Sequence, residues 1–123
     1  MKNQTNLEEQ LKGVMDYFTP KIIAEVNDQY VKIAKIKGQD IPWHNHENED
    51  ELFYILKGEL LMEIENEPER ALQTGDVFVV PKGVNHRVSS EKECAVMLIE
   101  TRSTKHAGKV ESAITKSIEE QLY

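Results

Sequence analysis

The sequence contains almost no cysteine, which excludes a disulfide-stabilised fold. Cys94 is the single cysteine among 123 residues, so no internal disulfide can form and the fold does not depend on an oxidising compartment. Cys94 precedes an apolar run at residues 95–99. That position predicts a small buried side chain rather than a reactive thiol.

Long apolar runs and basic residues are also scarce. No apolar run approaches the ~18 residues of a membrane-spanning helix, so we expect no membrane partner. The first nine residues lack the apolar centre of a signal peptide, so we expect the chain to act in the cytoplasm. Fifteen basic residues against 22 acidic ones give a net charge of −7. Because an acidic chain repels phosphate backbones, we also expect no nucleic acid partner.

What the chain has is enough apolar sequence for one core. A hydrophobic fraction of 39% is too high for a disordered chain, and 123 residues suit one domain. We expect an N-terminal helical segment at residues 1–19, a single barrel at residues 20–102 and a polar tail at residues 103–123.

Apolar residues near the N-terminus follow the spacing of a short helix. The stripe, at i, i+4, i+7, i+8 and i+11, consists of Leu7, Leu11, Val14, Met15 and Phe18. Asn6 precedes it as a plausible N-cap, and Pro20 ends the segment. We expect this helix to pack on the outside of a sheet.

From residue 22 onward the pattern changes to short strands separated by turns. The expected strands are residues 22–26, 30–36, 51–56, 60–65, 70–73, 77–80, 86–89 and 94–100. Many short strands with closely spaced turns are typical of an all-β sandwich or barrel. Several strands are apolar on both faces, so their outer faces need a cover. We therefore predict a homodimer, in which a second copy helps to cover the strand at residues 52–56.

Histidines and one carboxylate form a pattern suited to a metal ion. His44 and His46 are two residues apart, so on a strand both imidazoles point to the same side. Imidazole is the commonest protein ligand for a first-row metal. Glu51 can add an oxygen ligand, and a barrel can return His86 to the same interior. His106, in the polar tail, stands outside this group.

Glycines and a proline frame these residues in two spaced runs. The first run is Gly38, five residues, His44, one residue, His46, four residues, Glu51, six residues and Gly58. The second run is Gly75, five residues, Pro81, one residue, Gly83, two residues and His86. Together they closely resemble the two signature motifs of the cupin superfamily, except that the usual closing asparagine of the second motif is replaced by Ser90. With the flanking strands, the resemblance covers residues 22–100.

The resemblance implies an all-β fold, the double-stranded β-helix or jelly-roll barrel, here with a short N-terminal helix. It also implies that His44, His46, Glu51 and His86 bind a divalent metal ion at the barrel centre. This ligand set suits Fe, Mn, Zn, Ni or Co almost equally. Four protein ligands leave two positions of an octahedron open, where a small molecule can bind.

Three stretches, residues 27–32, 50–58 and 80–86, resemble a narrower group of small single-domain bacterial cupins, often labelled mannose-6-phosphate isomerase-like. That label rests on fold, which does not establish a reaction. Our interpretation is a metal-dependent enzyme of dioxygenase or isomerase type that acts on a small molecule. The alternative is a cupin that binds or senses a ligand or metal without turnover. The sequence has no helix-turn-helix pattern, so we do not expect a DNA-binding regulator.

Two residues near the expected ligands are candidates for catalysis, Tyr54 and Lys35. Tyr54 is adjacent to Phe53 on one strand, so one of these two rings faces inward. Lys35 either points into the barrel mouth or is a surface lysine. Trp43 either lines the pocket or packs elsewhere.

Acidic residues precede Glu51 in the loop at residues 47–50. The loop either flanks the site or is an ordinary solvated loop. Asp50 is adjacent to Glu51, and spacing alone favours Glu51 over Asp50 only modestly as the oxygen ligand.

Overall fold

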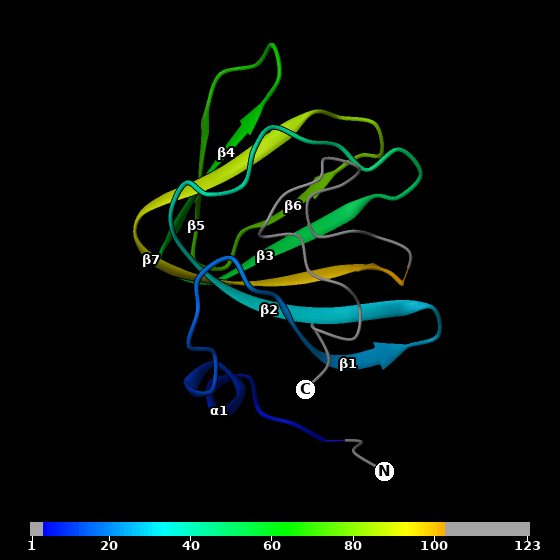
Figure 1. The fold of residues 1–123 in the computed structure, drawn as a ribbon, viewed down its shortest axis with the longest axis vertical. Coiled ribbons are helices and arrows are strands. Elements are labelled where there is room, and N and C mark those ends of the chain that lie inside the picture. Colours follow the sequence, from blue (N-terminus) through cyan, green and yellow to red (C-terminus); the bar gives the residue numbers. More distant parts are fainter. Residues whose placement is uncertain (1–3, 103–123) are drawn as a thin grey trace.

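A computed structural model describes residues 4–102, which fold into antiparallel strands and one short helix (Figure 1). The expected tail at residues 103–123 lies outside the described residues. The elements, in chain order, are α1 (Leu7–Lys12), β1 (Lys21–Val26), β2 (Gln29–Gly38), β3 (Glu51–Lys57), β4 (Glu59–Ile64), β5 (Arg70–Gln73), β6 (Val77–Val80) and β7 (His86–Thr101). Within residues 4–102, no helix is long and apolar enough to cross a membrane. The all-β prediction is confirmed.

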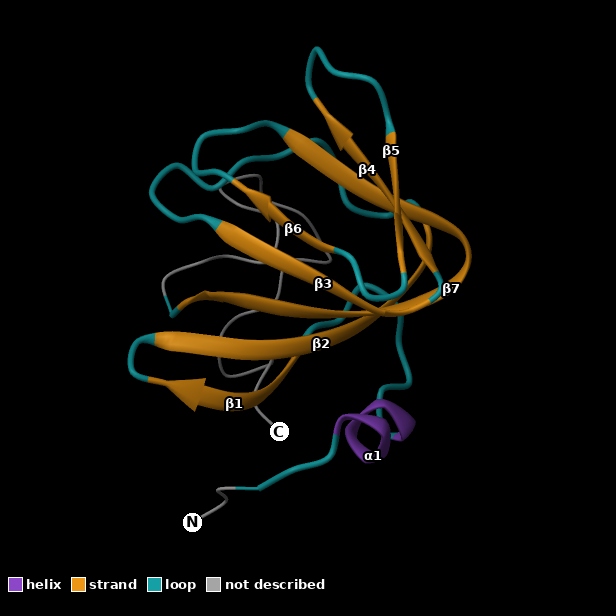
Figure 2. Cartoon of the chain, turned by 180° about the vertical axis from the view of Figure 1, so that it is seen from behind, coloured by secondary structure: helices purple, strands orange, loops and turns teal. Residues whose placement is uncertain are grey.

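Strand β7 joins two sheets and replaces two shorter strands that the sequence predicted. Its first half pairs with β4, and its second half pairs with both β2 and β3. The larger sheet has the order β1-β2-β7-β3-β6, while β4 and β5 extend from the first half of β7. Figures 1 and 2 show β7 bending as it passes from one sheet to the other. The main core contains residues from both sheets, as in a jelly roll.

Helix α1 is shorter than the apolar spacing predicted. Asn6 caps it as expected, because its side-chain oxygen accepts a hydrogen bond from the first turn at 3.1 Å. The helix ends at Gly13, a residue of low helix propensity. Val14 still packs on the outer face of the larger sheet, whereas Met15 is exposed and Phe18 enters the main core. The predicted helix to Phe18 is therefore wrong, although α1 does lie outside the sheet (Figure 2).

Strand β3 alternates strictly between its two faces. Glu51, Phe53 and Ile55 are buried, while Leu52 and Tyr54 are only partly buried. Phe53 and Ile55 belong to the main core, so the inward face of β3 carries Phe53 and the outward face carries Tyr54. The question that the sequence left open at Phe53 and Tyr54 is thereby answered.

Gly58 connects β3 to β4 at the place where β7 bends. Its φ of +88° lies in the left-handed region, which glycine adopts without steric cost. A Cβ at this position would also lie 3.0 Å from the Cβ of Cys94. Cys94 is buried, as its apolar neighbours predicted. The turn therefore requires glycine for its backbone conformation and for the close approach of β7.

Candidate metal centre

The two motifs meet through backbone hydrogen bonds. The amide of His44 donates to the carbonyl of His86 at 3.0 Å, and the amide of His86 donates to the carbonyl of His44 at 2.9 Å. The amide of Gly83 donates to the carbonyl of His46 at 2.8 Å. These bonds hold the loop that precedes β3 against the start of β7, as in an antiparallel pair. The histidines of both motifs are thereby fixed at the backbone level.

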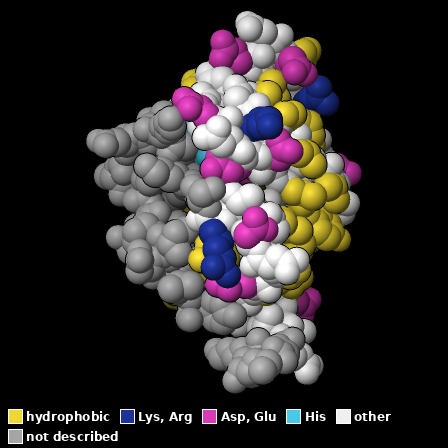
Figure 3. Space-filling model, turned by 90° about the vertical axis from the view of Figure 1, so that its right-hand side faces the viewer, with side chains coloured by type: hydrophobic (Ala, Val, Ile, Leu, Met, Phe, Trp, Pro, Cys, Tyr) yellow, Lys and Arg dark blue, Asp and Glu magenta, His cyan; other side chains and the backbone are white. Residues whose placement is uncertain are grey.

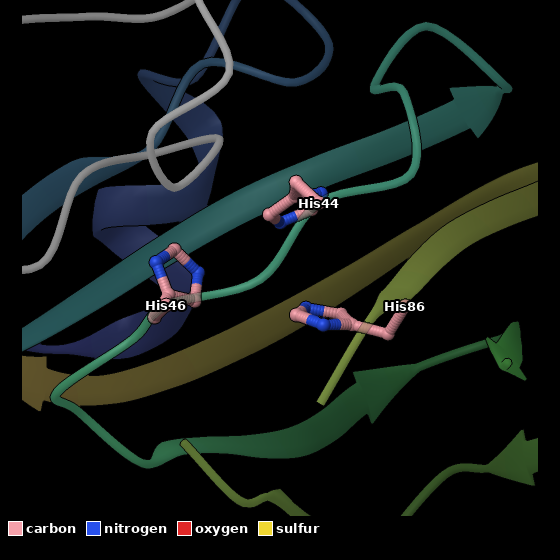
Figure 4. A group of neighbouring side chains, drawn as sticks. All are labelled: His44, His46 and His86. Carbon is pink, nitrogen blue, oxygen red and sulfur yellow. The ribbon is translucent and has the colours of Figure 1, made fainter. Parts of the chain in front are cut away.

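Three buried imidazoles point toward one another at this junction (Figure 4). His44, His46 and His86 are each at most 4% exposed. One candidate ligand nitrogen from each ring lies within 4.8 Å of the other two. Three imidazoles with this separation and burial are positioned to bind one metal ion.

Hydrogen bonds determine which ring nitrogen faces the centre. The Nδ1 atom of His44 lies 2.8 Å from the carbonyl oxygen of Pro42, and that of His86 lies 2.9 Å from the carbonyl oxygen of Val84. A carbonyl can only accept, so Nδ1 carries the proton in both rings and the Nε2 lone pair remains available. Among the described residues, the Nε2 atoms of His46 and His86 have no hydrogen-bond partner. A divalent metal would satisfy these buried nitrogens, so the residues present fit such an ion.

Glu51, and not Asp50, lies beside the imidazoles. Its Oε1 atom is 3.5 Å from Nε2 of His46 and 3.6 Å from Nε2 of His86. Asp50 is exposed, and its carboxylate accepts a hydrogen bond of 2.8 Å from the amide of Lys82. The strand alternation at the start of β3 therefore turns Glu51 inward and Asp50 outward.

A second buried carboxyl group lies next to Glu51, and the sequence analysis missed it. Glu100, on β7, is 2% exposed and is within hydrogen-bonding reach of the Glu51 carboxylate. The Oε1 atom of Glu100 lies 2.6 Å from Nζ of Lys32. Lys32 belongs to β2, and its side chain is completely buried. Both residues share a strand face with apolar residues, and this alternation was the signal that could have identified them.

Burial and neighbouring charges shift the pKa values of these groups in different directions. Burial, followed by the adjacent His86 imidazole, lowers the pKa of His44 to about 4. Burial alone would raise the pKa of Glu51, but its contacts with Glu100, His46 and His86 hold that pKa well below its ordinary value. Burial and the Glu51 carboxylate raise the pKa of Glu100 well above its ordinary value. A neutral His44 beside an ionised Glu51 suits a cation at neutral pH.

Comparison with known proteins identifies the family. Residues 34–101, more than half of the chain, match the Cupin domain family. The chain is a cupin. It is similar to YdbB of Bacillus subtilis (strain 168), described as an uncharacterized protein, with 41% identity over 68 residues, which are 55% of this chain and 59% of that protein. The match thus spans less than two thirds of the length of this curated relative.

Two solved structures share most of the cupin's length. A cupin-2 domain containing protein from Shewanella frigidimarina NCIMB 400 is 33% identical, with a TM-score of 0.75, over 79% of this chain and 93% of that one. Protein NMB1881 from Neisseria meningitidis is 28% identical, with a TM-score of 0.73, over 80% of this chain and 99% of that one. These similarities support the jelly-roll fold along nearly all of the described residues.

A small cavity lies beside the histidines of the cupin. Its volume is about 40 Å³, which is enough for a few water molecules, since each needs roughly 10–15 Å³ on this measure. The polar residues that line it are His44, Glu51, His86 and Glu100, and the apolar ones are Phe18, Pro20, Ala34, Ile36, Ile41, Phe53, Val88 and Leu98. No lysine or arginine from residues 4–102 is among them. The cavity is therefore apolar apart from the side chains around the candidate metal centre.

The structure does not bring the two catalytic candidates to this cavity. Tyr54 lies on the outward face of β3, and Lys35 lies on the same face of β2 as Ile33, which packs in the cluster outside the sheet. Neither lines the cavity. Trp43 is also absent from the lining, and its ring packs against Arg87, whose Cζ atom is 4.7 Å from the ring centroid. Of the alternatives that the sequence left open, the structure has Phe53 rather than Tyr54 facing inward and has Lys35 on the outward face of β2.

The pKa of His44 gives a testable consequence for metal-free protein. Its imidazole should titrate near pH 4 rather than near its ordinary value of 6.5. Because the folded-state pKa is depressed, the unfolded chain binds more protons between these pH values. The stability that neutral His44 contributes is therefore present above pH 6.5 and is lost as the pH falls toward 4.

NMR titration of the His44 ring in the presence of a chelator measures this pKa directly. The difference in unfolding free energy between the wild type and His44→Gln should also fall by roughly 3 kcal/mol at most across that window. A His44 ring that titrates at or above pH 6.5 would contradict the effect of burial.

Proposed function

We propose that this cupin binds one divalent metal ion through His44, His46, Glu51 and His86 and uses it to act on a small molecule. The observation that carries the proposal is the meeting of three buried imidazoles, two of them with Nε2 atoms that lack a hydrogen-bond partner in the described chain. Fe, Mn, Zn, Ni and Co all suit such ligands. The metal would supply Lewis-acid chemistry or activate a bound molecule, as in an enzyme of dioxygenase or isomerase type.

The cavity indicates which small molecules suit the site. Its lining is mainly apolar, and its volume of about 40 Å³ leaves room for only a few atoms unless side chains move. A phosphorylated sugar needs cationic partners for its phosphate, and none from residues 4–102 lines the cavity. A small, largely apolar molecule with one metal-binding oxygen or sulfur atom fits the lining better.

Metal content tests the proposed ligands. Because each histidine contributes a buried nitrogen to the centre, His44→Ala and His86→Ala should each reduce bound metal to a small fraction of the wild-type content. Elemental analysis of protein purified without added metal provides the measurement, and circular dichroism checks that the strands remain. His106→Ala and Cys94→Ser are the matched controls and should keep their metal, because neither belongs to the proposed ligand set. Full metal content in both ligand variants would refute the assignment.

Turnover distinguishes an enzyme from a cupin that only binds or senses a ligand. The Fe(II)-loaded protein should consume dioxygen in the presence of a small phenol, thiol or diketone, since these molecules combine apolar atoms with a metal-binding atom. Oxygen uptake is measured with an electrode, and His86→Ala supplies the background rate. If the protein binds metal tightly but consumes dioxygen no faster than His86→Ala with every compound, the result would favour a cupin that does not catalyse this chemistry.

We also propose that the cupin is a homodimer that uses the outer face beside β6. This strand is the last in the larger sheet, and Val77 and Val79 on it are 58% and 46% exposed. Hydrophobic side chains gather along one side of the molecule in Figure 3. An exposed apolar edge strand favours pairing with another copy. The buried free thiol of Cys94 agrees with the cytoplasm as the expected compartment.

Light scattering tests the dimer and its face. The wild type should have twice the chain mass of 14.2 kDa, and Val79→Lys should return to the mass of one chain because a charge on an edge strand opposes pairing. Val26→Lys is the matched control, since Val26 is 58% exposed on β1 at the other edge of the sheet, and it should remain dimeric. A monomeric wild type would refute the dimer, and dissociation by Val26→Lys alone would move the interface to β1.

A further inference from the structure

Three ionisable side chains lie side by side on the inner face of three neighbouring strands. β2, β7 and β3 are adjacent in the larger sheet and carry Lys32, Glu100 and Glu51 respectively. Lys32 is paired in register with Leu98, two residues from Glu100, so Lys32 and Glu100 are diagonal neighbours on one face. Glu51 begins β3 on the other side of β7, where Leu52 is paired with Ile99. The register of the sheet therefore aligns a lysine and two carboxyl groups in a row.

The row runs from the apolar interior to the candidate metal centre. Nζ of Lys32 is 2.6 Å from Glu100. Glu100 lies across from Glu51, because Leu52 and Ile99 are paired in the antiparallel ladder, and both carboxyl groups line the same cavity. Glu51 in turn lies 3.5 Å from His46 and 3.6 Å from His86. Within residues 4–102, Glu100 is the one ionic partner found for the Lys32 ammonium. Any movement of Glu100 therefore changes what holds the Glu51 carboxylate.

Stability alone is a poor explanation for such a pair. Lys32 and Glu100 are 0% and 2% exposed, and removing two charges from water costs about as much as, or more than, their attraction returns. Apolar side chains of similar volume would often serve the core equally well. Glu100 nevertheless lines the cavity together with Glu51, His44 and His86. The Lys32–Glu100 pair thus lies close enough to the proposed metal ligands to influence their orientation.

We propose that Lys32 and Glu100 are positioning residues that orient the Glu51 carboxylate and thereby set the affinity of the centre for its metal ion. Lys32 fixes Glu100, and Glu100 fixes Glu51 through the contact between their carboxyl groups. Partners outside the ligand set commonly have this effect, and their loss typically lowers metal affinity about 10- to 100-fold. The inference rests on the proposed metal binding, which the experiment below tests separately.

The experiment compares three variants of the full chain with Co²⁺ as the probe. Lys32→Met/Glu100→Leu removes both charges together, so that no unpaired charge is left in the core. Glu100→Gln is the conservative variant, because an amide can still accept from Lys32 and donate to Glu51. Glu25→Leu/Arg102→Met removes an ion pair of 3.1 Å on the surface and serves as the control. The dissociation constant and the visible absorption spectrum of bound Co²⁺ are recorded for each, together with the melting temperature of the metal-free protein.

We expect the core double variant to bind Co²⁺ about 10- to 100-fold more weakly, with an altered absorption spectrum, because Glu51 is no longer oriented. Glu100→Gln should keep the affinity and the spectrum of the wild type but lower the melting temperature, because it leaves the Lys32 ammonium without an ionic partner. The surface control should keep the affinity and the spectrum of the wild type. A changed melting temperature with unchanged affinity and spectrum in the core double variant would show a purely structural role and overturn the inference while leaving the metal site intact. A wild type that binds Co²⁺ no better than His86→Ala would overturn the metal site and this inference with it.

Discussion

The site depends on one pair of backbone hydrogen bonds, those that His44 and His86 exchange at 3.0 and 2.9 Å. Forty-two positions of chain separate these residues, and side-chain contacts alone would have to close that loop against its entropy. A backbone pair fixes the Cα positions and the side-chain directions together. The two rings consequently lie with their centroids 4.4 Å apart. The fold itself therefore holds these two imidazoles next to each other.

Because the backbone pair draws both motifs into the barrel, several polar side chains are buried in the interior. His44, His46, His86, Glu51 and Glu100 are all buried beside an apolar cavity, where each polar atom without a partner costs free energy. The structure reduces this cost in two ways. Carbonyl groups of the chain accept the Nδ1 protons of His44 and His86, and Lys32 compensates one carboxyl charge. Among the described residues, the buried side-chain atoms that still lack a hydrogen-bond partner are the Nε2 atoms of His46 and His86, which face the centre, together with Nζ of Lys32 and Oε2 of Glu100.

The sequence was sufficient to predict the strands and the histidines, but not the inward face of each strand. The spacing of His44 and His46 and the framing glycines carried the motif, and the structure brings these rings together with His86. On β2, however, Val31 and Ile33 on one face are as apolar as Ala34 and Ile36 on the other. Because both faces of β2 are covered, periodicity could not decide between them. Lys35 was therefore considered for the site, while Lys32 was missed.

The positions of the irregularities in the sheet explain why the inward face matters so strongly. Register shifts occur between Ile36 and Gly38 on β2 and between Ile55 and Lys57 on β3, close to the bend of β7. The opposite halves of these strands, which carry Lys32 and Glu51, are regularly paired with β7, although β1 has a further register shift between Ile22 and Ala24 where it pairs with β2 beside Lys32. In a regular ladder a shift by one residue moves every side chain to the other face. A shift in the pairing of β3 with β7 would therefore turn a neighbouring residue inward in place of Glu51 and turn the Glu51 carboxylate outward. The bend absorbs the distortion that closing the jelly roll requires, and the regular end keeps the ionisable residues aligned.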